Sequence, residues 1–117
     1  YVPIGDFMGY WWHFSESNGC KQYLQLEENK LCFKIDVTGE EDYKRLRKKW
    51  HDKVVAAADE APIDAVKPSK FGKGKTMTVA VFPDDYRVTD DEGIIDMEQT
   101  LERLQHAEEV LTRAVES

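Results

Sequence analysis

Two stretches of alternating apolar and polar residues, separated by a polar dipeptide, constrain the fold of this chain most strongly. Leu24 and Leu26 precede Glu28-Asn29, and apolar residues follow it at every second position from 31 to 37. Such alternation is typical of a strand with one buried face. If Glu28-Asn29 forms a two-residue turn, Leu26 lies opposite Leu31. Leu24 then lies opposite Phe33, so the apolar residues share one face of an antiparallel hairpin.

A further strand is predicted before this hairpin. Residues 10–14 form an aromatic run that favours a pleated, half-buried strand. Asn18-Gly19 follows as a turn signal, because both residues tolerate positive φ. The same register pairs Cys20 with Val37, so Cys20 and Cys32 are not neighbours and we expect no disulfide between them. Free thiols indicate a reducing, cytoplasmic location.

Two helices are predicted downstream. Thr38-Gly39-Glu40-Glu41 matches a capping box at the start of the first helix, and Pro62 ends it. Its apolar residues recur at three- and four-residue steps: Tyr43, Leu46, Trp50, Val54 and Ala57. The second helix runs from the N-cap Asp96 to about Val115. Its predicted inner face consists of Met97, Leu101, Leu104, Ala107 or Glu108, Leu111, and Ala114 or Val115.

The order of these elements predicts an α+β fold. Residues 76–82, apolar and β-branched, predict a strand at the centre of the sheet between the two helices. The chain therefore reads as a three-stranded antiparallel meander, a helix, a further strand and a C-terminal helix (βββαβα), with both helices packed on one face of the sheet. Its 117 residues suit a single domain, 1–117. Because the chain begins at Tyr1 rather than Met, we expect a C-terminal fragment of a larger protein.

Charge is unevenly distributed along the chain. The net charge is −7, yet residues 44–75 contain ten Lys and Arg against four Asp and Glu. The overall charge opposes general nucleic-acid binding, whereas the basic middle allows a local patch. Two interpretations stay open for it: a helix face paired with the acidic parts of the same chain, or a nucleic-acid contact. The sequence contains no run of about 20 apolar residues, so no membrane partner is predicted.

Two groups of residues are candidates for binding. The loop 62–75 interleaves Pro and Gly with lysines, and these are the predicted nucleic-acid contacts: Lys67, Lys70, Lys73 and Lys75. Tyr10, Trp11 and Trp12 are the predicted interface residues. Alternation turns part of the aromatic run into the core, and the rest faces a partner domain, since paired Trp side chains are costly to leave in water. Base stacking on these rings is the alternative.

No catalytic or metal site is predicted. Gly74-Lys75-Thr76 lacks both the upstream Gly and the following helix of a P-loop. Glu28-Asn29-Lys30 has the letters of a nuclease E-x-K but falls in the predicted hairpin turn. The three histidines lie on different predicted elements, without metal-ligand spacing to another His or Cys. A small hydrolase that uses Cys32 or His51 stays a third hypothesis, because catalytic partners meet in space.

Three segments together resemble a known family: YLQLEENKLCFKI, KPSKFGKGKTMTVAVF and DDEGIIDMEQTLERLQHAEEVL. They are similar to the C-terminal part of bacterial proteins of the PD-(D/E)XK nuclease superfamily, over about Gly9 to Val115. In that family the metal-binding Asp and the E-x-K lie in an upstream domain, so the resemblance carries no catalytic residue over to this chain. It implies an accessory module attached to a nuclease-like enzyme that handles foreign DNA.

We therefore expect a non-catalytic accessory or interaction module of a larger nuclease-like bacterial protein that assists DNA binding. Its partners would be the upstream domain, DNA and a second copy of the chain. The alternative is a stand-alone protein-interaction or dimerisation module that uses the aromatic strand. We expect no cofactor in this chain, and a divalent metal would belong to the upstream nuclease domain.

Overall fold

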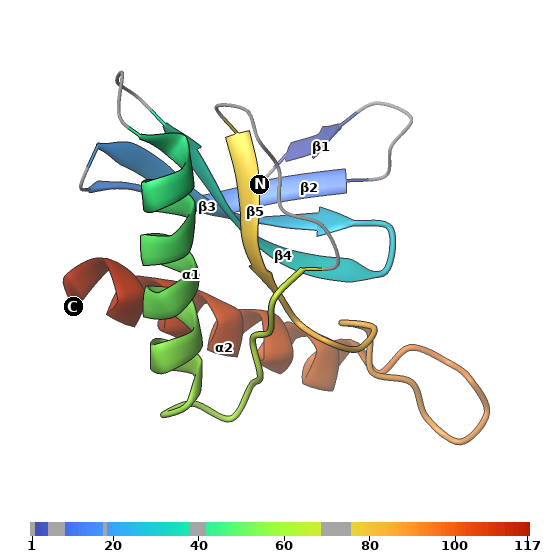
Figure 1. Ribbon diagram of the computed structural model, residues 1–117. Coiled ribbons are helices and arrows are strands. Elements are labelled where there is room, and N and C mark those ends of the chain that lie inside the picture. Colours follow the sequence, from blue (N-terminus) through green and yellow to red (C-terminus); the bar gives the residue numbers. More distant parts are fainter. Residues whose placement is uncertain (1, 5–8, 18, 38–41, 69–75) are drawn as a thin grey trace.

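A computed structural model describes residues 2–4, 9–17, 19–37, 42–68 and 76–117 (Figure 1). The elements are β1 (Val2–Ile4), β2 (Gly9–Ser17), β3 (Cys20–Glu27), β4 (Lys30–Val37), α1 (Tyr43–Ala58), β5 (Thr76–Val81) and α2 (Met97–Glu116). The strands form one antiparallel sheet in the order β1-β2-β3-β4-β5. The predicted α+β class and the βββαβα order from β2 onward are confirmed. The short strand β1, which pairs with β2, was not predicted.

The β3–β4 hairpin has the predicted register. Leu26 pairs with Leu31 and Leu24 with Phe33 across the two-residue turn. Cys20 pairs with Val37, while Cys32 faces another residue of β3, and both thiols are free and buried. The one-sided alternation of the sequence therefore fixes which face of the sheet becomes the core.

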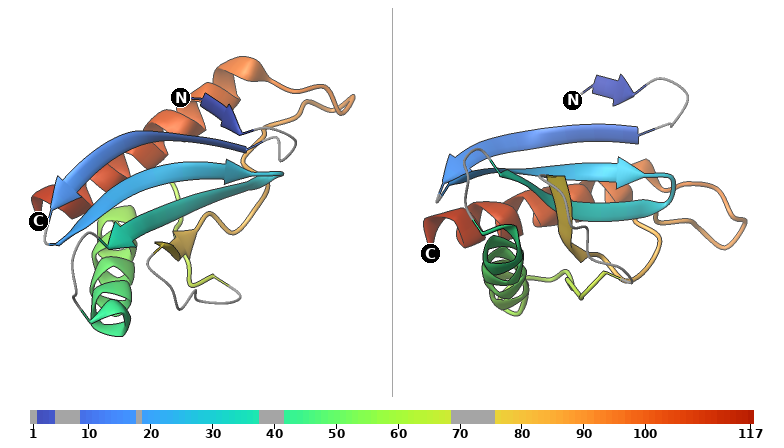
Figure 2. Two further views of the ribbon diagram at one scale, coloured as in Figure 1. Left: turned by 90° about the horizontal axis from the view of Figure 1, so that it is seen from above. Right: turned by 45° about the horizontal axis from the view of Figure 1, so that its top comes forward.

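Both helices cover this apolar face, as the right-hand view of Figure 2 shows. Phe33 of β4, Trp50 of α1 and Leu111 of α2 belong to one buried cluster. The predicted stripe of α1 is buried from Leu46 to Ala57, whereas Tyr43 at the helix start is exposed. Burial of one face of the sheet by two amphipathic helices is the main source of stability for such a two-layer fold.

The start of α1 differs from the capping-box prediction. Asp42 is the N-cap, and its carboxylate accepts hydrogen bonds from the backbone N–H groups of Lys44 (3.1 Å) and Arg45 (3.2 Å). Residues 38–41, which carry the predicted capping box, lie outside the described residues. Asp42 supplies the same capping chemistry one turn later, so Thr38 is not the cap of this helix.

The predicted inner face of α2 is partly wrong. The N-cap Asp96 is confirmed, with its carboxylate accepting from the N–H of Gln99 at 3.0 Å. Met97 and Leu101, however, are 62% and 50% exposed. Ala107, Leu111 and Ala114 are buried as predicted, and in the first turns the smaller Thr100 is buried in place of Met97 and Leu101. Small side chains allow close approach of helix and sheet, and the larger residues of the first turns lie at the surface.

β5 lies at the edge of the sheet, so the prediction of a central strand is wrong. Its buried residues Val79 and Ala80 belong to the core cluster, and two contacts protect its open edge. Val66, ahead of the strand, exchanges two backbone hydrogen bonds of 2.9 Å with Val81. His51 of α1 donates from Nδ1 to the carbonyl oxygen of Val79 at 2.7 Å. These contacts satisfy edge groups that would otherwise template pairing with another chain.

A buried glutamine holds the end of the β2–β3 hairpin. Gln22 is fully buried, and its Nε2 donates to the carbonyl oxygens of Ser17 (2.9 Å) and Cys20 (2.7 Å). Its Oε1 accepts from the Ser15 hydroxyl at 2.9 Å. Loss of one member of a buried network leaves the other polar groups without partners, which costs more than the bonds themselves contribute.

We predict that Gln22→Ala lowers the free energy of unfolding by about 2 kcal/mol, because it leaves these groups unpaired and opens a cavity. The measurement is the midpoint of urea unfolding at constant m-value. Gln25→Ala, on the half-exposed opposite face of β3, is the matched control and should change stability by less than about 0.5 kcal/mol. Equal effects of the two substitutions would show that the network is not stabilising.

Candidate nucleic-acid interface

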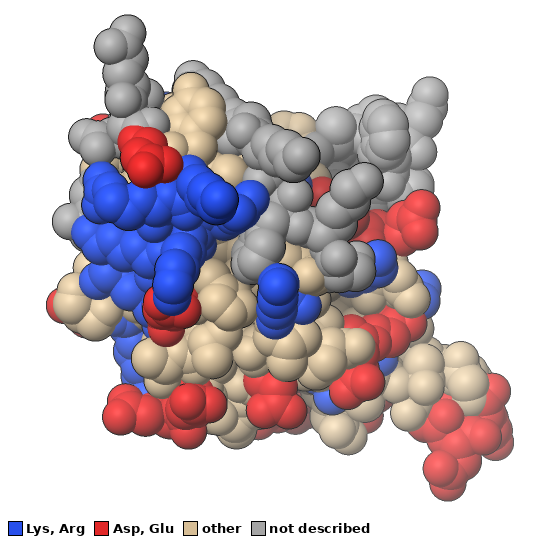
Figure 3. All heavy atoms as spheres, viewed as in Figure 1, with Lys and Arg blue, Asp and Glu red and all other residues tan. Residues whose placement is uncertain are grey.

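The exposed side of α1 carries a dense group of cations, which we call the basic face. It consists of Lys44, Arg45, Arg47, Lys48 and Lys49, together with Lys67 from the segment before β5. With Asp42, His51 and Asp52 these residues line an open recess of about 810 Å³. Figure 3 shows a large area of Lys and Arg at the left and smaller, separate basic groups to its right, with carboxylates along the lower edge and on the loop at the lower right.

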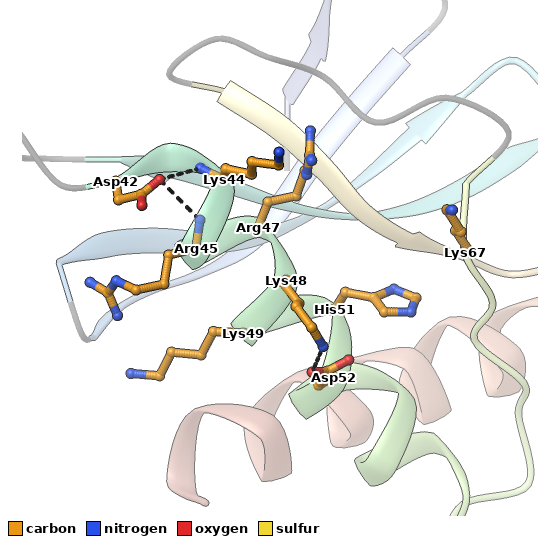
Figure 4. Close-up of a pocket in the computed structure, with 9 residues that line it drawn as sticks. All are labelled: Asp42, Lys44, Arg45, Arg47, Lys48, Lys49, His51, Asp52 and Lys67. Atoms are coloured by element: carbon orange, nitrogen blue, oxygen red, sulfur yellow. Dashed lines mark hydrogen bonds and ion pairs between the residues drawn. The ribbon is translucent and has the colours of Figure 1, made fainter.

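The helical repeat of α1 explains why these side chains gather. Residues three and four apart lie on the same side of a helix, and the buried stripe occupies the opposite side. Figure 4 shows Arg45 and Lys49 pointing away from Lys67, so the basic face wraps around the helix rather than forming a single row. Lys53 is used differently: its Nζ donates to the Ser117 carbonyl oxygen at 2.8 Å and lies 5.5 Å from the centroid of the Trp50 ring.

The position of these cations opposes the stability of the helix. The N-terminus of a helix carries partial positive charge, so Lys and Arg in the first turn are unfavourable by a few tenths of a kcal/mol each. The first turn of α1 contains no acidic residue, whereas Lys44 and Arg45 both lie in it. In α2 the arrangement is the favourable one, with Glu98 in the first turn and Arg113 in the last. Residues that oppose the local stability of a helix in this way occur mainly at functional sites.

Two carboxylates temper the charge of the basic face without neutralising it. Lys48 Nζ and Asp52 Oδ2 form an ion pair of 2.8 Å within α1, and the hydrogen bond from Lys48 lowers the pKa of Asp52. Asp42 is engaged in capping the helix. Around the recess, six cations stand against two anions.

The structure places only part of the predicted lysine loop. Lys67 is exposed and lines the recess with the cations of α1, and its nucleic-acid contact stays a prediction. Lys70, Lys73 and Lys75 lie outside the described residues. Sequence reasoning assigned binding to the loop and treated the helix cations mainly as partners of the acidic segments. The missed signal was the concentration of basic residues in a first helical turn that itself contains no acidic residue, next to the N-cap Asp42.

The aromatic residues of β2 divide between the two faces of the sheet. A bulge between Trp12 and Ser15, with His13 at a φ of 62°, allows Trp12 to pack against the core while Phe14 lies on the outer face. Phe14 is 59% exposed and stacks on Tyr23, with ring centroids 5.3 Å apart. Trp11 lines an outer recess of about 340 Å³ beside this stack. Tyr10 lies in β2, but its side chain is outside the described part.

Within the described residues, the groups considered for catalysis are in structural positions. Cys32 is 2% exposed, and burial raises the pKa of its thiol to about 11, so only about one thiol in ten thousand is ionised at pH 7. His51 holds the edge of β5. The described side chains include no cluster of three His, Cys, Asp or Glu that could bind a metal ion. Neither described helix is long and apolar enough to cross a membrane.

Comparisons with protein-family models, with curated proteins and with solved structures find no match to this chain. The resemblance to the C-terminal part of PD-(D/E)XK nucleases therefore stays a prediction.

We predict that Lys44→Glu raises the free energy of unfolding by about 0.3–1 kcal/mol, because it replaces an unfavourable charge at the N-terminus of α1 by a favourable one. Lys48→Glu is the comparison, and it should lower stability because it replaces the cation that pairs with Asp52. Thermal unfolding at low ionic strength measures both. A destabilising Lys44→Glu would show that Lys44 serves the fold rather than a ligand.

Proposed function

We infer that this chain is a non-catalytic module that binds the phosphate backbone of DNA through the basic face of α1 and Lys67. The observation that carries this proposal is the placement of Lys44 and Arg45 in the first turn of α1, where they weaken the helix. A surface that lowers stability is retained where it binds something, and six cations around one open recess favour a polyanion.

The geometry suits backbone contact more than reading of base sequence. The basic face is convex around α1 and carries long, mostly exposed side chains, which reach phosphates at several orientations. Exposed charges more than about 10 Å away are largely screened at 0.1 M salt, so the acidic segments need not prevent binding. Neutralisation of four to six phosphates predicts a slope of log K against log salt of about −4 to −5.

The parent protein that we propose is a nuclease-like bacterial enzyme whose metal and catalytic residues lie in an upstream domain. The resemblance of three segments to that superfamily supports this part of the proposal, as does the structural use of Cys32 and His51 in this chain. The two free, buried thiols support a cytoplasmic location.

We predict that Lys44→Glu/Lys48→Glu weakens binding to a labelled DNA duplex of about 20 base pairs at least tenfold at about 50 mM salt. The slope against salt should fall by about two, because two phosphate contacts are lost. Fluorescence anisotropy measured over a salt series gives both quantities.

The control is Lys21→Glu/Lys30→Glu, which changes the net charge equally at exposed positions outside the basic face. It should leave affinity within about twofold of the unaltered protein. Absence of binding by the unaltered protein at low salt, or equal losses in both double variants, would contradict the proposal.

The outer face of the sheet supports a second candidate, a protein-interaction or dimerisation surface. The observation in its favour is the exposed Phe14–Tyr23 stack beside Trp11. Light scattering over a range of concentrations tests it: a dimer that Phe14→Ser abolishes is expected. A protein that stays monomeric throughout that range rules out self-association by this face.

A further inference from the structure

We propose that a groove beside the N-terminal half of α2 binds an amphipathic, basic helix of a partner protein. This site is separate from the basic face and does not depend on DNA binding. The α2 groove has a volume of about 400 Å³. Its apolar lining comes from β2, β3, the loop 84–96 and α2: Trp12, Leu26, Ile95, Met97, Leu101 and Leu104.

Exposed apolar side chains are concentrated at the groove. Of the described large hydrophobic residues, seven are exposed, and four of these lie between positions 94 and 101. They include Met97 and Leu101, both at least half exposed, on the outward side of α2. Single exposed apolar residues are common, but a contiguous group of them marks an interaction site.

The loop 84–96 forms one wall of the groove. Figure 1 shows this loop projecting beyond the start of α2. The N–H of Val88 donates to the Thr100 hydroxyl at 2.9 Å, and the N–H of Asp96 donates to the Val88 carbonyl oxygen at 2.7 Å. Asp90 accepts from the N–H of Ile94 at 3.0 Å. These bonds fix the loop while its isoleucines point outward, so the groove exists before a partner arrives and little ordering entropy is lost on binding.

The length of the groove fits a helix. Met97 and Glu108, at its two ends, are separated by eleven residues of α2, or about 17 Å and three turns. Glu108 at the far end contacts His13 of β2, with 3.4 Å between Glu108 Oε2 and His13 Nδ1. A partner helix of three turns presents apolar residues at positions i, i+4 and i+7 on one side, which is the pattern that a groove of this length accepts.

Charge around the groove selects a basic partner. Residues 84–109 contain ten Asp and Glu and two Arg. Both arginines are engaged locally: Arg87 pairs with Asp85 at 2.6 Å, and Arg103 donates to the Asp85 carbonyl oxygen at 3.0 Å. Glu98 and Glu102 are exposed on the flank of α2 beside Leu101. An apolar groove with this rim favours a helix whose apolar residues are flanked by Lys or Arg.

The same features disfavour the other occupants. The carboxylates of the rim repel a phosphate backbone. A second copy of this chain offers the complementary charge on α1, but the lining of its basic recess consists of charged residues and His51, without an apolar side chain to enter the groove. The basic recess of a second copy therefore lacks one of the two properties that the groove selects.

The test uses a labelled synthetic helix about four turns long, with leucines at i, i+4 and i+7 and lysines elsewhere. Fluorescence anisotropy with the full chain should give saturable binding. Leu101→Ser should weaken it at least tenfold, because the group removed lies in the groove and its exposure leaves the fold intact. Glu98→Lys/Glu102→Lys should also weaken it, and more strongly at low salt.

Three controls make the result specific. Tyr43→Ser, at an exposed apolar position at the start of α1 and outside the groove, should retain affinity within about twofold. A peptide of the same composition with scrambled leucines, and one with glutamate in place of lysine, should bind at least tenfold more weakly. Equal binding of the scrambled peptide, no effect of Leu101→Ser, or a dimer in light scattering that Leu101→Ser abolishes would each overturn the proposal. The last result would assign the groove to a second copy of the chain.

Discussion

The one-sided burial of β3 and β4 is the constraint on which the rest of this structure depends. Because Leu24 and Phe33 project to the same face, both helices must pack there, and Trp50 and Leu111 complete the cluster. The sides of α1 and α2 that do not pack on the sheet then face solvent, and so does the opposite face of the sheet. The three candidate binding surfaces are these remaining sides, so their positions follow from the choice of buried face.

The parts of the fold that could be predicted are those in which local pattern and tertiary contact agree. A two-residue turn leaves one parity for the β3–β4 pairing, and so the register could be derived residue by residue. The position of β5 in the sheet could not be predicted in this way. An apolar strand has the same sequence pattern whether it is covered by neighbouring strands or by a nearby segment of the chain. In this chain Val66 and His51 protect the edge, and both contacts come from residues distant in sequence. The exposure of Met97 and Leu101 was missed because apolar periodicity gives weight to large side chains, whereas the buried residue of the first turns is the polar Thr100.

The candidate surfaces were less predictable than the fold. Net charge by segment located the basic part of the chain, but only the structure shows that the cations of α1 line one recess together with Lys67. The boundary of α1 mattered most. Once Asp42 is the N-cap, Lys44 and Arg45 lie in the first turn, and their conflict with the helix dipole becomes visible. The capping box predicted at residues 38–41 had placed the same cations further inside the helix, where no such conflict arises.

The two proposed sites have opposite charge and lie on different parts of the molecule. We expect this difference to make each site selective for its own partner. A duplex that approaches the acidic loop or the α2 groove is repelled and is steered toward the basic face, which also raises the rate of productive encounter. A basic helix is repelled by α1 for the same reason and is attracted to the groove. Because attraction and repulsion act together, neither partner competes for the other's site. Under the two proposals, a net charge of −7 is therefore compatible with polyanion binding on one side and selection of a basic helix on the other.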